Sequence, residues 1–227
     1  MSSRTLYRWS GIVLLVGSLL GVIGSILDTV LSTGQNQTAQ QILSTPFTID
    51  ASLFLAWALL LVMALPGLYL RQATRAGALG FAGFVLLLLG LLLGGVAFAT
   101  IQVTIFPYLA QSAPKLLPSN GTGPDAGFLL WIFGPLLLLT VGNILLGIAT
   151  MRARVFPRWT GILLLLSGVL YLLSIPHIPS PFGDIISFAS NVVFFVALAW
   201  CGYLLVRQEQ ETAEAVARPA AQVGASR

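Results

Sequence analysis

Four polar residues in this apolar chain carry side chains that can bind a ligand or move a proton: Asp28, Gln102, His177 and Asn191. Together they offer one carboxylate, one imidazole and two amides, a set that can hold a polar ligand or support proton transfer. We predict that they line a shallow, outward-facing pocket. No spacing among them matches a metal or catalytic motif, so the sequence predicts no catalytic residue, no metal site and no cofactor.

Asp28 is the charge that its local sequence explains least. The other three aspartates each stand just before an apolar segment: Asp50, Asp125 and Asp184. A carboxylate there caps the free N–H groups of a helix and meets the positive end of its dipole. Asp28 instead lies at the C-terminal end of its segment, where the dipole disfavours an anion. We expect it to face inward, with Lys115, His177 or a bound cation as its partner.

Six apolar segments must position these residues, and they cover approximately 11–31, 51–70, 78–104, 127–151, 159–175 and 185–206. About 20 apolar residues cross the ~30 Å hydrocarbon core as a helix. With 57% hydrophobic and 8% charged residues, a soluble domain of 227 residues would lack surface charge. The sequence predicts an all-α integral membrane protein, with one six-helix domain over 1–206. The polar tail 207–227 is expected to be partly helical and then disordered.

Arginines and aspartates fall on opposite sides of these segments. All ten arginines lie at the chain ends or in the connections 71–77 and 152–158. Basic residues in short loops mark the cytoplasmic side, so both termini are expected there, which agrees with an even number of crossings. The arginine-rich, lysine-poor composition favours a bacterial cytoplasmic membrane. The net charge of +4 is scattered and forms no basic stripe, which excludes nucleic acid as a partner.

A repeated opening sequence indicates internal duplication. ArgTrpSerGlyIle at 8–12 begins the first segment, ArgTrpThrGlyIle at 158–162 begins the fifth, and a looser version at 75–77 precedes the third. The even segments each end with a glycine followed by an arginine: Gly67 with Arg71, Gly147 with Arg152, and Gly202 with Arg207. This pattern predicts three parallel helical hairpins. The alternative is convergence, because basic and aromatic residues gather at any inner membrane interface.

Small residues predict where the helices touch. Helices in lipid associate where small side chains let backbones approach and where polar side chains hydrogen-bond. Gly21 belongs to such a face in the first segment, Gly90 and Gly94 form a GxxxG pair in the third, and Asn143 lies in the fourth. The same faces are candidates for contact with a membrane-protein partner or a second copy, while leucine-rich faces meet the lipid bilayer.

With its arginine-tryptophan openings and arginine-closed hairpins, the chain resembles uncharacterised six-helix, multi-pass membrane proteins of bacteria over most of 4–208. The resemblance implies a membrane location and no activity. Three functions remain open: an accessory or scaffold subunit of a larger complex, a passive carrier or channel for an uncharged or lipid-like solute, and a membrane enzyme using Asp28 and His177. We rank them in that order. A continuous polar cavity would favour the carrier or channel.

Overall fold

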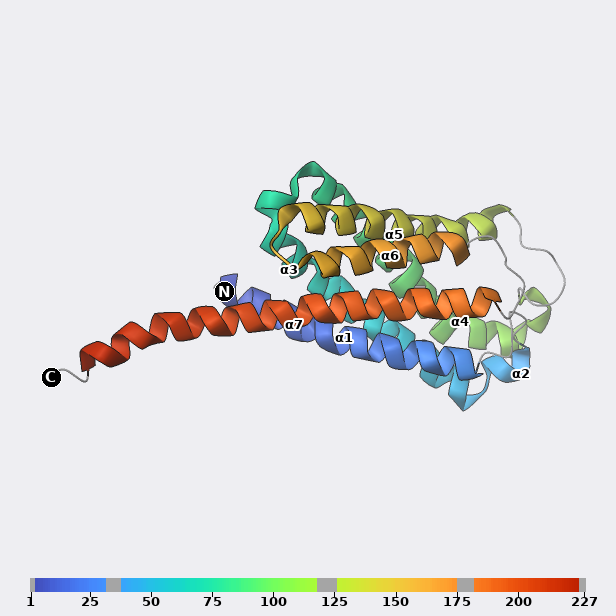
Figure 1. The fold of residues 1–227 in the computed structure, drawn as a ribbon. Helices are drawn as coiled ribbons and strands as arrows, with labels where there is room; N and C mark the ends of the chain where they lie inside the picture. The colour runs from blue at the N-terminus through green and yellow to red at the C-terminus, as the bar shows by residue number, and fades with distance from the viewer. Residues whose placement is uncertain (1–2, 32–37, 118–125, 175–181, 225–227) are drawn as a thin grey trace.

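The computed structural model is almost entirely helical and describes residues 3–31, 38–117, 126–174 and 182–224 (Figure 1). In lipid the backbone must satisfy its own hydrogen bonds, which the leucine-rich segments do as helices. The elements are α1 (Ser3–Leu31), α2 (Ala39–Ile42), α3 (Thr45–Gly90), the π-helix η1 (Leu91–Ala97), α4 (Phe98–Ser112), the 3-10 turn η2 (Pro114–Leu116), α5 (Ala126–Ala153), α6 (Arg158–Ser174) and α7 (Phe182–Gly224). Each of the six apolar segments is helical apart from the last residue of 159–175, which is not described.

The long helix α3 reverses direction at Gly77. Its φ of 61° and ψ of −163° lie in a region that is essentially restricted to glycine. The aromatic ring of Tyr69 stacks on that of Phe84, with centroids 4.6 Å apart, so the chain returns alongside itself. We call residues 45–76 the first arm and residues 78–112, which include η1 and α4, the second arm.

Replacing Gly77 with alanine tests this turn. No atom lies within 4 Å of an added Cβ, so the expected cost of about 1–3 kcal/mol in unfolding free energy comes from backbone conformation alone. Gly24 is the matched control, because it is helical within α1 and an added Cβ meets only Trp57, at an ordinary 3.8 Å. Gly24→Ala should be neutral or slightly stabilising. Unfolding in mixed micelles measures both, and equal effects would contradict the assignment of strain to Gly77.

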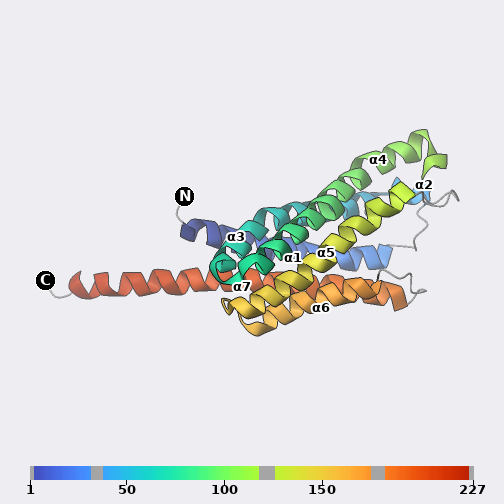
Figure 2. The same cartoon turned by 90° about the horizontal axis from the view of Figure 1, so that it is seen from above.

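The long helical segments form a closed ring in which neighbours run antiparallel (Figures 1 and 2). α1 packs against the first arm, the second arm against α5, α5 against α6, and α6 against α7, which returns to α1. The direction is clear where α1 meets α7: Gly11 contacts Gly202, and Gly21, further along α1, contacts Phe195. The first and last helices therefore lie side by side and complete the bundle.

Two junctions of this ring share one geometry. A Cβ placed on Gly11 would lie 2.8 Å from the carbonyl oxygen of Gly202, and one on Gly202 would lie 2.7 Å from that of Gly11. Gly147 and Gly161 show the same reciprocal approach, at 2.7 and 2.6 Å. Gly11 and Gly161 are the glycines of the matched sequences at 8–12 and 158–162. Their partners are the glycines that precede Arg207 and Arg152 at the ends of α7 and α5.

The small residues expected at helix contacts pack against other helices of the same chain. Gly21 leaves room for the Phe195 ring, Gly90 meets the backbone of Leu139, and Gly94 faces Pro135. Asn143 is fully buried. These faces are therefore occupied by neighbouring helices of the same molecule, and they do not by themselves indicate a partner.

The two ends of the ring differ in charge: arginines gather at one, while Asp28, Asp50 and a single lysine, Lys115, lie at the other. The arginine end holds the start of α1, the Gly77 turn and the connection between α5 and α6, and both termini extend from it (Figure 1). There the guanidinium of Arg71 lies over the ring of Tyr7, 5.4 Å from its centroid, which joins the first arm to α1. Asp28 and Asp50 lie at the opposite, acidic end, where α1 finishes and α3 begins.

Helix α7 continues beyond the bundle to Gly224 (Figure 1). The tail 207–227, which the sequence predicts to be partly helical and then disordered, is therefore helical as far as Gly224. Its alternating glutamine, glutamate and alanine residues have high helix propensity, which is sufficient to extend a helix that is already nucleated.

Four helical stretches are long and apolar enough to cross a membrane: Thr5–Val30, Thr45–Ser112, Phe133–Ala153 and Ile185–Arg207. The second of these contains both arms. Helix α6 is apolar but has 17 residues, or ~25 Å of rise, slightly less than a bilayer core. Large apolar side chains face outward around the ring, including Met63 and Trp159, at 71% and 72% exposure. An apolar outer surface of this kind belongs in lipid, while the number of crossings stays a prediction.

Candidate functional site

A cavity of about 300 Å³ lies inside the ring toward its acidic end. All six long segments contribute to its wall, which consists of Gly24, Ser25, Asp28, Asp50, Phe54, Trp57, Leu91, Gly94, Gly95, Phe98, Gln102, Leu139, Tyr171 and Asn191. This volume is at the lower end of the range for small-molecule sites. The cavity is therefore large enough for a small solute.

Small residues and a widened helical turn create this space. The π-helix η1 carries Gly94 and Gly95 on the cavity wall, and π-helical turns are frequent at functional sites. Across the cavity, Gly24 of α1 leaves an added Cβ 3.8 Å from the indole of Trp57, an ordinary contact. Bulkier residues at these positions would reduce the space between α1 and the two arms.

A continuous chain of ring contacts, the aromatic belt, runs around the cavity through Phe106, Phe98, Phe54, Trp57, Phe195, Phe194 and Tyr171. Phe54 stacks on Trp57 with centroids 4.9 Å apart, and Trp57 meets Phe195 edge-on at 5.0 Å. Phe194 and Phe195 are buried behind the wall, whereas Phe54, Trp57, Phe98 and Tyr171 line it. The belt gives the cavity rigid, electron-rich walls.

Polar groups are concentrated on the same wall. Asp28 is exposed, Asp50 is half-buried, and both carboxylates belong to the cavity wall. The hydroxyl of Tyr171 donates to Oδ1 of Asn191 at 2.5 Å, which links α6 to α7. The Ser25 hydroxyl donates to the carbonyl of Gly21 at 2.9 Å, within its own helix.

Asp50 has a different place from the one expected. Helix α3 begins at Thr45, and its N-cap is Ser44, whose hydroxyl accepts from the N–H of Phe47. The prediction that Asp50 caps this helix is wrong, because the helix starts five residues earlier, with Pro46 in its first turn. Asp50 instead lies beyond the first turn and lines the cavity.

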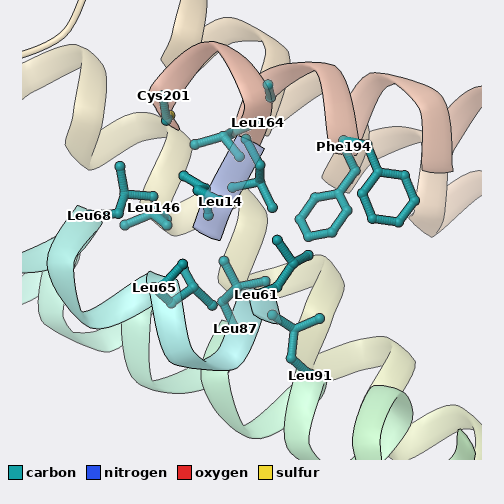
Figure 3. Packing of buried hydrophobic residues seen from close by; sticks show 14 of the residues in the cluster. Leu14, Leu61, Leu65, Leu68, Leu87, Leu91, Leu146, Leu164, Phe194 and Cys201 are labelled. Atoms are coloured by element: carbon teal, nitrogen blue, oxygen red, sulfur yellow. The ribbon is translucent and has the colours of Figure 1, made fainter. Parts of the chain in front are cut away.

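Toward the arginine end, a leucine layer closes the cavity. It consists of fully buried side chains from every long segment of the ring: Leu14, Leu61, Leu65, Leu87, Leu146, Leu164 and Leu198. Figure 3 shows leucines from several helices converging around Leu14, with Phe194 beside them. Each lies one to three helical turns from a cavity-lining residue of its own segment, toward the arginine end. Within the described residues, these side chains close the space toward the arginine end, which removes support for a channel in this conformation.

Three of the four residues expected to share a pocket line this cavity. Asp28 comes from α1, Gln102 from α4 and Asn191 from α7, three helices far apart in sequence. His177 lies outside the described residues, so the enzyme hypothesis that pairs it with Asp28 stays a prediction.

Sequence reasoning missed Asp50, Phe54 and Trp57. Their spacing of i, i+4 and i+7 places them on one face of a helix, which was the available signal. The spacing does not tell whether that face points to lipid or to the interior.

The apolar ring with one acidic, aromatic cavity defines the class: an all-helical membrane protein with a small-molecule-sized cavity near one end. The chain belongs to a family described as a domain of unknown function (DUF4386), whose profile matches residues 9–208. The match covers the whole ring and stops where α7 leaves the bundle. No curated protein and no solved structure matches the chain.

Proposed function

We propose that this protein crosses a bacterial cytoplasmic membrane six times, with both termini in the cytoplasm, and acts as a carrier for a small polar solute. The arginine end would then face the cytoplasm. The cavity would be the binding site in an outward-open state. The observation that carries this proposal is a cavity lined by residues near the acidic end and closed toward the arginines by the leucine layer.

A carrier needs a second state in which the same cavity opens to the other side. The ring contains elements suited to such a change. The π-helix η1 lies in the cavity wall, and Pro66 and Pro135 interrupt backbone hydrogen bonding in the first arm and α5. The two reciprocal glycine junctions lie at two of the three boundaries between the proposed hairpins, which would move as units against one another. The leucine layer would separate along these hairpin boundaries.

An accessory role in a larger complex is the second candidate. The observation that favours it is the part of α7 that extends past the bundle to Gly224 and reaches beyond the helices that surround it (Figure 1). Removing residues 210–227 distinguishes the two candidates. A carrier would keep solute binding in its cavity, whereas a subunit that docks through this extension would lose its complex.

Labelling of introduced cysteines from each side of an oriented vesicle tests the carrier proposal. The native Cys201 is buried among the same leucines and would be uncovered with them, so the cysteines are introduced into a Cys201→Ala protein, which is the unreactive control. Gln102→Cys should react rapidly with a membrane-impermeant maleimide added to the acidic side. Leu14→Cys, in the leucine layer, should react slowly and only from the arginine side, because that layer must open during a transport cycle.

The two positions give separate answers. If Gln102→Cys does not react from the acidic side, the cavity is not open there and the proposal fails. If Gln102→Cys reacts to completion while Leu14→Cys never reacts, the bundle has one state, and a static binding or accessory role replaces the carrier.

A further inference from the structure

We infer that the cavity binds a small organic cation, an amine or quaternary ammonium group held between the two carboxylates and the aromatic belt. This inference rests on the proposed function, because it requires the cavity to be a solute site. It replaces the uncharged or lipid-like solute expected from the sequence. Its basis is the combination of Asp28, Asp50 and aromatic faces on one wall.

The charge of the lining selects a cation. Among the described residues that line the cavity, two are acidic and none is basic. Asp50 is half-buried, Asp28 is exposed, and both carboxylates line the same cavity. A positive ligand in the cavity would be attracted by both negative charges, whereas an anion would be repelled by both.

The aromatic wall favours an organic cation over a metal ion. Phe54 and Trp57 form a stacked pair directly after Asp50 in the first arm, and Tyr171 lines the same cavity from α6. Faces of tryptophan, tyrosine and phenylalanine attract ammonium groups, and such cages recognise quaternary amines. Within the described part of the chain, no group of three or more acidic, histidine or cysteine side chains is placed to hold a metal.

Two amide side chains in the cavity wall, Gln102 and Asn191, could bind a polar group on the same ligand. Asn191 is held by the hydroxyl of Tyr171, and Gln102 lies half-buried on the second arm. Amide groups at these positions can bond to a hydroxyl or amide on the ligand. The site therefore matches a ligand with an ammonium head and a short polar arm, within about 300 Å³.

Choline and its uncharged isostere, 3,3-dimethylbutan-1-ol, test the inference because they have nearly the same shape. The full-length protein in mild detergent is titrated with each at constant ionic strength, and intrinsic tryptophan fluorescence reports binding. Choline should change the signal and the neutral alcohol should bind at least about tenfold more weakly. Trp57→Phe should remove most of the signal, whereas Trp159→Phe, at the exposed start of α6, should keep it.

Carboxylate variants identify the charges. Asp28→Asn and Asp50→Asn should each lower choline affinity about tenfold while leaving the unfolding midpoint nearly unchanged. Glu211→Gln, in the part of α7 beyond the bundle, is the matched control and should bind as the unmodified protein does. If Asp50→Asn unfolds, Asp28→Asn alone carries the test, because Asp28 is exposed.

The outcomes separate this inference from the proposed function. Equal binding of choline and the neutral alcohol, or unchanged affinity in both carboxylate variants, overturns the organic cation and leaves the carrier intact. No binding of either compound, with Gln102→Cys still labelled from the acidic side, also overturns the cation alone. Failure of that labelling removes the solute site and with it both proposals.

Discussion

Gly147→Ala is expected to lower the free energy of unfolding by about 3 kcal/mol, a large effect for one methyl group. The added Cβ would lie 2.7 Å from the carbonyl oxygen of Gly161 and equally close to the backbone N of Leu165. Both obstacles are backbone atoms, so no side-chain rotation relieves the clash. α5 and α6 must separate, and the contact of Gly168 with Asn143 further along the same pair would then be lost.

Two further glycine substitutions, one in an uncrowded position and one at the second glycine junction, test the cause of this effect. Gly24→Ala adds the same methyl to α1, where it meets Trp57 at an ordinary 3.8 Å, and its unfolding midpoint in mixed micelles should change little. Gly11→Ala should cost about as much as Gly147→Ala, because Gly11 faces Gly202 in the same reciprocal way. A cost confined to one junction would show that the two openings share sequence without sharing a structural role.

Ser25→Leu is expected to close the cavity to solutes. Ser25 lines the wall, and its hydroxyl bonds only within its own helix, to the carbonyl of Gly21, so little stability depends on it. In a protein that also carries Gln102→Cys, the leucine should slow maleimide labelling from the acidic side by at least about tenfold, since a steric penalty of about 1.4 kcal/mol is sufficient. Choline binding should be lost as well.

Ser52→Leu is the matched control for this substitution. Ser52 makes the same kind of bond, to the carbonyl of Thr48 at 2.6 Å, but it is exposed on the outside of the first arm. Its leucine variant should label and bind as the parent does. If Ser25→Leu leaves the labelling rate unchanged, the reagent reaches Gln102 by a path that does not pass through the cavity, and the assignment of that space as the entry route is wrong.

Much of the fold follows from the sequence because hydropathy and charge act locally. Each apolar segment is a helix because its own backbone must satisfy its hydrogen bonds in lipid, whatever its neighbours are. The arginines gather at one end for a similarly local reason: each short connection at that end carries its own basic residues in its sequence. The start of α3 also depends on local sequence. Ser44, Thr45 and Pro46 are typical of a helix N-terminus, so they indicated that the helix begins before Asp50.

The direction in which each helical face points depended on the tertiary structure. Asp28, Gln102 and Asn191 were expected together because all three are polar and near the outer side. Their meeting depends on ring closure, which brings α7 back to α1. The aromatic belt depends on the turn at Gly77, because that reversal places Phe98 of the second arm 6.3 Å from Phe54 of the first.

By itself the sequence determined an apolar, all-helical chain with arginines on one side and a polar set on the other. Only the tertiary structure decided that this set borders a cavity, that Asp50 and Trp57 belong to it, and that leucines close its inner end. The reason is physical: helix formation and charge placement depend on neighbours along the chain. A cavity depends on which side chains from all six segments are too small to fill the space between them.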